Sequence, residues 1–330
     1  MKKSFPNIRL RRLRANSSIR NLVRENVLSP FDLIQPLFVI EGKGKIEKIK
    51  SMPSITRMSI DNIVKEVKVL KKLGIQAIAL FPYISKKLKN LSGSESYNPK
   101  GLIQNCIQEI KDKVNDMIII SDIALDPYTS HGQDGILNKN GKILNDETIE
   151  ILVNQSLSHA VSGSDIIAPS DMMDGRIKVI RKALEKEGHK ETMILSYSAK
   201  YSSNFYGPFR DAVGSNKNLG SSKKDTYQMD FSNKKDAIRE IELDISEGAD
   251  MIMVKPGMPY LDIVSLANKS FNVPILAYQV SGEYSMIKAA CKNKWLEEKS
   301  VVLESLTCFK RAGANAIITY YAKEAAKWIK

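Results

Sequence analysis

The chain has 330 residues, 43% of them hydrophobic, and its 50 Lys and Arg outnumber 37 Asp and Glu, which gives a formal net charge of +13. This length and apolar content suit two ordinary domains or one large barrel. The sequence contains no run of about 18 apolar residues, so no membrane span is predicted. The only cysteines, Cys106, Cys291 and Cys308, form no CxxC. That argues against a disulfide framework or a cysteine-based metal site and favours a reducing compartment, so we expect a cytoplasmic protein.

The basic residues are dense at the N-terminus, where no acidic residue precedes Glu25 and the first 24 residues include Lys2, Lys3, Arg9, Arg11, Arg12, Arg14, Arg20 and Arg24. Three interpretations compete: an arm that binds nucleic acid, a transit peptide, or an arm that embraces another subunit. Composition alone does not separate them. A drift of the amino-acid composition toward Lys, Ile and Asn would also explain the overall excess of lysine without any function.

Short apolar, β-branched segments recur along the chain and read as continuous apolar runs, as expected of parallel strands that are covered on both faces. There are eight of them: Pro36–Ile40, Ala77–Phe81, Met117–Ile123, Asp165–Pro169, Met193–Tyr197, Met251–Val254, Pro274–Val280 and Ala316–Tyr321. Amphipathic segments lie between them and predict helices: Ile60–Leu73, Glu147–Val161, Arg176–Lys186, Ala237–Ser246, Met286–Lys292 and Val301–Arg311.

Eight β/α units in roughly 300 residues predict a single (β/α)8 barrel, an α/β fold. We assign residues 31–330 to this barrel and residues 1–30 to an N-terminal oligomerisation arm. The alternative is an open doubly wound sheet, which would normally carry a glycine-rich phosphate loop after its first strand. The segment "VIEGKGKIEK" matches neither such pattern.

Three segments that follow strands are long: residues 82–101, 126–146 and 199–235. In a barrel these segments open on the C-terminal face, where active sites are built. The last one is rich in Ser, Gly, Asn and Lys with interspersed aromatic residues, and this composition predicts a mobile lid.

Two lysines stand at the ends of neighbouring predicted strands: Lys255 ends strand six, and Lys200 follows strand five. Adjacent ammonium groups disfavour each other's protonation, and burial acts in the same direction. A lysine with a lowered pKa attacks carbonyl carbon and forms a Schiff base. A solvated rim position is the ordinary explanation for one lysine, but two at adjacent strand ends favour a catalytic pair.

Other polar residues fall on the same predicted face. The loop "SDIALDPYTSHGQDG" contains Asp122, Asp126, His131 and Asp134, which suit acid/base chemistry or a hard cation, or else turn and cap formation. The predicted lid carries Arg210 and the pair Lys223–Lys224, groups able to clamp a carboxylate or phosphate or to serve as ordinary surface charge. The hydroxyls of Ser281 and Tyr320 are further candidate donors there.

The chain resembles the porphobilinogen synthase (δ-aminolevulinic acid dehydratase) family over nearly its whole length. The matching segments are long and occur in order: "RLRRLR", "FVIEG", "SDIALDPYTSHGQDG", "APSDMMDGR", "SYSAKYSSNFYGPFRDA", "TYQMD", "MVKPGMPYLDIV", "YQVSGEYSMIKAA" and "LESLTCFKRAGANAIITYYA". The resemblance implies a (β/α)8 barrel whose N-terminal arm wraps a neighbouring subunit, usually in a homo-octamer. It also implies a hydro-lyase that condenses two 5-aminolevulinates to porphobilinogen, with loss of two waters, in haem biosynthesis.

The resemblance also implies roles for individual residues. Lys255 matches the lysine that forms the Schiff base with the substrate of the propionate side, and Lys200 matches the lysine that engages the other substrate. Asp122 matches an active-site aspartate, to which we assign proton relay. The family's substrate-carboxylate ligands match Ser281 and Tyr320 for the first substrate, and Arg210 and Lys224 for the second.

The family divides by metal, and this chain departs from the zinc-using branch. Where that branch has cysteines, this chain has Ala124, Asp126 and Asp134, and oxygen ligands suit a hard cation better than zinc. The resemblance is therefore to the aspartate-rich branch, in which Mg²⁺ or K⁺ replaces catalytic zinc. That branch also has an activating Mg²⁺, whose glutamate matches Glu240; a solvated helix residue is the ordinary alternative.

Two other classes remain open on the residues alone. A different Schiff-base barrel, such as an aldolase, explains Lys255 but leaves the second lysine and the basic lid without a role. A basic nucleic-acid binder without catalysis explains the charge but leaves unexplained the lysines at strand ends. We expect 5-aminolevulinate as the substrate and no nucleic-acid or membrane partner.

Overall fold

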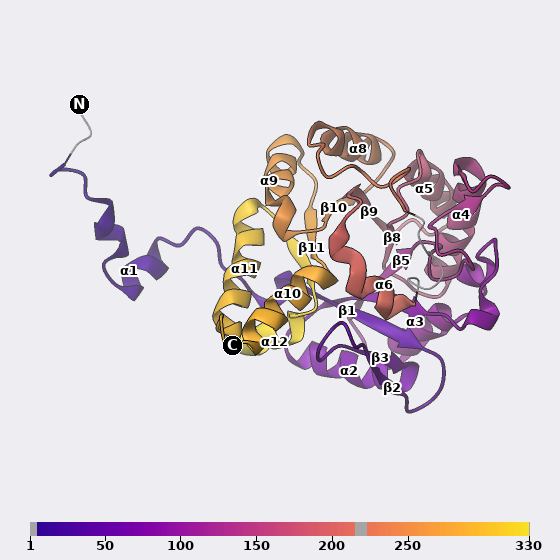
Figure 1. The fold of residues 1–330 in the computed structure, drawn as a ribbon, viewed down its shortest axis with the longest axis horizontal. Coiled ribbons are helices and arrows are strands. Elements are labelled where there is room, and N and C mark those ends of the chain that lie inside the picture. Colours follow the sequence, from indigo (N-terminus) through magenta and orange to yellow (C-terminus); the bar gives the residue numbers. More distant parts are fainter. Residues whose placement is uncertain (1–4, 215–222, 330) are drawn as a thin grey trace.

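The computed structural model describes residues 5–214 and 223–329. Its centre is a closed barrel of eight parallel strands in the order β1-β4-β5-β8-β9-β10-β11-β12, with β12 paired back onto β1 (Figure 1). The strands are β1 (Leu33–Ile40), β4 (Ala77–Tyr83), β5 (Ile118–Ile123), β8 (Ile166–Pro169), β9 (Met193–Lys200), β10 (Met251–Lys255), β11 (Ile275–Gln279) and β12 (Ala316–Thr319). The predicted barrel is therefore confirmed, and the open sheet is excluded.

Helices cover the outside of the barrel, and their apolar faces pack against the strands. They are α2 (Ile60–Lys72), α3 (Leu102–Lys113), α4 (Asn145–Val161), α5 (Arg176–Lys186), α8 (Lys235–Ser246), α9 (Leu261–Ser270), α10 (Ser281–Lys292), α11 (Glu298–Ala312) and α12 (Ala322–Ile329). Helix α2 ends where Gly74 takes a φ of +90°, a left-handed conformation that favours glycine after a helix. Among the described residues, no helix has the length and apolar character needed to cross a membrane.

Two additions depart from the plain barrel. Strands β2 (Ile46–Lys48) and β3 (Thr56–Ser59) form an antiparallel hairpin, and β3 pairs in parallel with the end of β1, from Phe38 to Ile40. A second small hairpin joins β6 (Ile136–Leu137) to β7 (Ile143–Leu144). The sequence prediction contained neither hairpin, nor α3, α9 and α12, and it began α10 five residues late.

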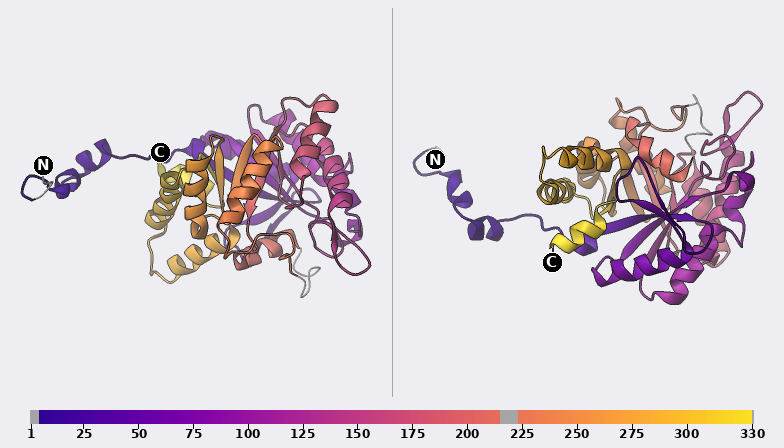
Figure 2. Two further views of the ribbon diagram at one scale, coloured as in Figure 1. Left: turned by 90° about the horizontal axis from the view of Figure 1, so that it is seen from above. Right: turned by 60° about the horizontal axis from the view of Figure 1, so that its bottom comes forward.

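The N-terminal residues lie apart from the barrel. Residues 5–27, which include α1 (Ser17–Leu22), project away from it in both views of Figure 2. Apolar side chains on this segment are exposed, among them Leu22 at 85% and Leu10 at 66%. The segment thus has apolar surface that the barrel of its own chain leaves uncovered.

The segment predicted to be a lid contains a short helix, α6 (Gly207–Val213), which follows β9 and lies across the face of the barrel (Figure 1). Helix α6 packs against α10 and β4. Residues 215–222, which the predicted lid includes, lie outside the described residues.

Candidate active site

The two candidate lysines are the last residues of neighbouring strands. Lys255 ends β10 and Lys200 ends β9, and the two are direct partners in the parallel register. Ile252 pairs with Ser196 whereas Val254 pairs with Ala199, so β9 contains one extra residue between these points. In a regular register Lys255 would face Ala199, and Lys200 would point to the opposite side of the sheet. This β-bulge therefore directs both lysines to the same side.

Lys255 lies in a buried aromatic environment, with 5% of its surface exposed. Its Nζ lies 4.6–5.4 Å from the ring centroids of Tyr197, Tyr206, Phe209 and Tyr278. Burial, reinforced by the charge of Lys200, lowers the pKa of Lys255 to about 7. A lysine in this state has a substantial fraction of neutral amine near neutral pH, which a carbonyl-attacking nucleophile requires.

Lys200 and Asp122 complete the centre of the site. Lys200 is buried, and its Nζ donates a hydrogen bond to the carbonyl oxygen of Ser170, just beyond β8. Burial raises the pKa of Asp122 to about 6, although Lys255 and Lys200 both act to lower it. The Oδ1 of Asp122 is buried without a hydrogen-bond partner among the described residues. This carboxyl group can therefore exchange a proton with a bound molecule near neutral pH.

The two aspartates of the aspartate-rich loop share a lysine. The Nζ of Lys224 lies 2.8 Å from Asp134 and 3.3 Å from Asp126. Tyr227 also donates a hydrogen bond to Asp134, at 3.0 Å. Burial would raise the pKa of Asp134, but Lys224 and Lys200 hold it at about 2; burial raises the pKa of Asp126 despite Lys224. Asp126 and Asp134 are thus both paired with a cationic side chain of the same chain.

These groups line one small cavity under α6. Besides Lys255, Lys200, Asp122, Asp126, Asp134, Lys224 and Arg210, its lining includes Ser170, Tyr206, Phe209 and Gln228. Its volume is about 30 Å³, which is room for a water molecule or two. Since Phe209 and Arg210 belong to α6, that helix has to move before a larger molecule can enter.

Three candidate residues lie outside this cavity. Ser281 is buried, and its Oγ accepts a hydrogen bond from the backbone N–H of Phe209 at 2.9 Å. The Tyr320 hydroxyl lies 3.0 Å from that of Tyr278. His131 is half-buried, and its Nε2 lies 3.4 Å from the carbonyl oxygen of Leu91. The Ser281 hydroxyl is therefore engaged by the backbone of α6. The Phe209 ring packs against Phe38, and Tyr320 stacks on that same Phe38 ring.

Several lining residues were missed in the sequence, above all the aromatic rings around Lys255 and the carbonyl of Ser170. A signal existed for Tyr206 and Phe209, since both lie beside Arg210 in the segment predicted to be a lid. The hydrogen bond from Tyr227 to Asp134 joins distant segments. No local pattern predicts it.

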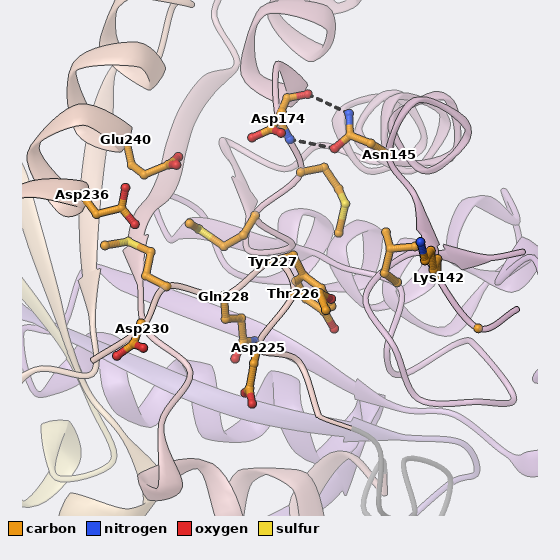
Figure 3. Close-up of a pocket in the computed structure, with 15 residues that line it drawn as sticks. Lys142, Asn145, Asp174, Asp225, Thr226, Tyr227, Gln228, Asp230, Asp236 and Glu240 are labelled. Carbon is orange, nitrogen blue, oxygen red and sulfur yellow. Dashed lines mark hydrogen bonds between the residues drawn. The ribbon is translucent and has the colours of Figure 1, made fainter. Parts of the chain in front are cut away.

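Glu240 lies in a separate cleft of about 630 Å³ beside α8. Figure 3 shows Asp236 and Glu240 extending from α8 toward this cleft, with Asp174 across from them. Burial and the charge of Asp244 raise the pKa of Glu240 to about 7. Within residues 5–214 and 223–329, Asp174, Asp230, Asp236 and Glu240 form no ion pair, and no group of three or more His, Cys, Asp or Glu is arranged as a metal cage.

The fold and the cavity together define a (β/α)8-barrel protein with two buried lysines at the C-terminal ends of adjacent strands. The chain belongs to the delta-aminolevulinic acid dehydratase family, whose model matches residues 7–328. It is 52% identical to the delta-aminolevulinic acid dehydratase of Bradyrhizobium diazoefficiens over 98% of this chain and 91% of the relative, and 48% identical to that of Bacillus subtilis over 97% and 98%.

A solved structure agrees with this assignment. The fold matches that of delta-aminolevulinic acid dehydratase (porphobilinogen synthase) from Toxoplasma gondii in complex with the reaction product porphobilinogen. The TM-score is 0.96 at 49% sequence identity, and the match covers 97% of this chain and 91% of the other. The family resemblance seen in the sequence is confirmed.

Proposed function

We propose that Lys255 and Lys200 carry out the condensation of two 5-aminolevulinates in this chain. The protein is a porphobilinogen synthase, a hydro-lyase of tetrapyrrole biosynthesis, as its family and relatives indicate. The observation that carries the residue assignment is the register of β9 and β10, which pairs the two lysines directly at the ends of their strands. Two amines in one cavity suit a reaction that joins two ketones.

The chemistry balances if each lysine forms one Schiff base. Neutral Lys255 attacks the ketone carbon of the first substrate, and the carbinolamine loses water to give the imine. Lys200 does the same with the second substrate, which accounts for the second water. One new C–C bond and one new C–N bond then displace the two lysines, which return as free amines, and loss of protons gives the aromatic pyrrole. Asp122 is the group we assign to receive and return protons during these steps.

The substrates' carboxylates need cationic and hydroxyl partners. We assign Arg210 and Lys224 to the second substrate and Ser281 and Tyr320 to the first. Lys224 already pairs with Asp126 and Asp134, so a substrate carboxylate would share this lysine with them. Ser281 would become available when the N–H of Phe209 leaves it. Substrate binding on this assignment is therefore coupled to movement of α6.

We further propose that Mg²⁺ binds at Glu240 and activates the enzyme. Half-buried Glu240 lies near the carboxylates of Asp244, Asp174 and Asp236, and the charge of Arg176 acts against theirs. Magnesium prefers oxygen ligands and keeps several waters, so one carboxylate in an open acidic cleft is a suitable site. Lys142 also lines the cleft, and the ion would add positive charge beside Glu240, which has no ion pair among the described residues.

The active-site aspartates fit a metal less well. A Mg²⁺ or K⁺ at Asp126 and Asp134 would compete with the Lys224 ammonium. Zinc would find neither thiolate nor imidazole there, because the described residues that line the cavity include no Cys or His. We therefore propose no catalytic zinc and derive no step through an active-site cation.

The arm leads to a proposal on assembly. Its basic and apolar side chains are exposed, and we propose that they pack on a second subunit in a homo-octamer. Deleting residues 1–19 is expected to reduce the particle mass in light scattering and to leave the barrel's circular dichroism unchanged. An unchanged mass would contradict the proposal. We also propose a cytoplasmic location.

The experiment that tests the reaction is a pyrrole colour assay on the purified protein with 5-aminolevulinate as the sole substrate. Formation of porphobilinogen is expected. A protein that forms a Schiff base with other carbonyl compounds but gives no pyrrole would instead be an aldolase-like barrel.

A further inference from the structure

Helix α6 closes the active-site cavity in this structure. Phe209 and Arg210 belong to it and line the cavity, which has a volume of about 30 Å³. The Phe209 ring also packs edge-on against Phe81, with 5.3 Å between the centroids. The cavity is too small for 5-aminolevulinate while these side chains stay in place, so substrate binding requires Phe209 and Arg210 to move. The contacts that hold α6 closed therefore influence how well the second substrate is held.

The C-terminal end of α6 is held by Arg57, a residue of strand β3. Its Nε donates a hydrogen bond to the carbonyl oxygen of Ala212 and its Nη2 one to that of Asp211, both at 2.6 Å. These carbonyls carry the negative end of the helix dipole, and a guanidinium forms strong charge-assisted bonds with such acceptors. The Arg57 side chain is 13% exposed, so little water competes for these bonds.

Two further contacts hold the same end of α6. The Ser51 hydroxyl donates a hydrogen bond to Asp211 Oδ2 at 2.6 Å. The guanidinium of Arg57 lies 4.4 Å from the ring centroid of Tyr83, which fixes its orientation. Gly214, the cap residue of α6, has a φ of +70°, and a Cβ there would lie 2.6 Å from the Tyr83 ring. The C-terminal end of α6 thus packs against a surface formed by Arg57, Ser51 and Tyr83.

The position of Arg57 in the barrel explains how it reaches α6. Strands β1 and β12 pair only at Leu33 and Ile34. Farther along, β1 pairs instead with β3, where Arg57 lies opposite Phe38. The β2–β3 hairpin thus extends the wall at the C-terminal end of β1, beside the opening that α6 covers. A (β/α)8 barrel does not need this hairpin for closure, so its presence calls for another role.

We propose that Arg57, with Ser51 and Tyr83, forms a latch that holds α6 closed and so positions Arg210 for the carboxylate of the second substrate. Arg57 is a positioning residue, since it touches α6 and lies outside the cavity lining. The inference rests on the proposed role of Arg210. It adds a residue that sets affinity for the second 5-aminolevulinate without taking part in Schiff-base chemistry at Lys255.

The test compares Arg57→Ala, Arg57→Lys and Ser51→Ala with the native chain. Lys48→Ala is the matched control, because Lys48 is an exposed basic residue of the same hairpin. Hydrogen–deuterium exchange of residues 207–213 is measured without substrate, and KM and kcat are measured with 5-aminolevulinate. Arg57→Ala is expected to raise exchange in α6 and to increase KM about tenfold, because two charge-assisted bonds are lost. Arg57→Lys and Ser51→Ala are expected to raise KM by about threefold.

Borohydride trapping at Lys255 is expected to persist in all four variants, with kcat within about twofold of the native value. Unchanged exchange in α6 with unchanged KM in Arg57→Ala would overturn the latch. So would an equal effect of Lys48→Ala. If Arg57→Ala unfolds, Ser51→Ala decides, because that serine lies outside the hairpin strands. A native protein that makes no porphobilinogen would refute the proposed function, whereas the exchange measurement would still report on the latch.

Discussion

The cavity around Lys255 and the cleft around Glu240 are both rich in carboxylates, but they differ in how those charges are compensated. In the cavity, Lys224 lies within 3.3 Å of Asp126 and 2.8 Å of Asp134. In the cleft, Glu240 has no ion pair among the described residues, and its pKa rises to about 7. The cavity is small and closed, whereas the cleft has a volume of about 630 Å³. Carboxylates alone therefore do not indicate a metal site; the nearest cation of the chain has to be considered.

The largest expected effect follows from removing the proposed nucleophile of the cavity. Lys255→Ala should lower kcat roughly 10⁴-fold or more, because the side chain that forms the covalent intermediate is gone. Borohydride added with 5-aminolevulinate should trap an adduct at Lys255 in the native chain, located by peptide mass spectrometry. The measurement that would refute the assignment is near-normal turnover in Lys255→Ala, or an adduct found solely at another residue.

The next prediction removes the cation that pairs with the two aspartates of the cavity. Lys224→Met should lower the free energy of unfolding by about 3–5 kcal/mol, because Asp126 and Asp134 would then be buried without their partner. Denaturant unfolding monitored by circular dichroism measures this effect. Lys223→Met is the matched control, since the Lys223 side chain is 80% exposed and its loss should change stability by less than about 0.5 kcal/mol. Equal stability of the two variants would show that the buried pairing contributes nothing.

The pH dependence of the cavity tests its electrostatics separately from turnover. Lys255, with a pKa of about 7, attacks only as the neutral amine, so the rate of borohydride-trapped adduct formation should rise about tenfold per pH unit up to pH 7 and then level off. Lys200 lowers this pKa and Asp122 raises it. Lys200→Met should therefore shift the curve to higher pH, and Asp122→Asn to lower pH. Shifts in the same direction for both variants would contradict the described arrangement.

The sequence predicted the eight barrel strands because buried parallel strands read as continuous apolar runs. It also predicted the two lysines at adjacent strand ends. It treated them as a catalytic pair, but it did not predict the β-bulge between Ser196 and Ala199 that directs both to the same side. The β2–β3 hairpin was missed since its strands are only three and four residues long. The pairing of Lys224 with Asp134 joins residues 90 positions apart, and no local pattern encodes such a contact.

The smallest expected effect is the response of activity to Mg²⁺ at the Glu240 cleft. Activity should rise with Mg²⁺ by roughly fivefold, fall with EDTA and return when Mg²⁺ is added back. Glu240→Ala should lose this response and keep Schiff-base formation at Lys255, because the cleft is separate from the cavity. Glu242→Ala is the matched control, since Glu242 is an exposed residue of the same helix that does not line the cleft.

Because the metal would stabilise the assembled state, magnesium activation should be accompanied by a shift toward larger oligomers in light scattering. Asp126→Asn should retain the magnesium response, since that aspartate lies in the compensated cavity and pairs with Lys224. A zinc-selective chelator should have little effect, because the described lining of the cavity, within residues 5–214 and 223–329, offers zinc neither thiolate nor imidazole. Stoichiometric zinc in the purified enzyme, with activity lost on its removal, would show that Asp126 and Asp134 release Lys224 to bind a metal. The cavity and the cleft would then differ less in their capacity to bind a metal than their ion pairs suggest.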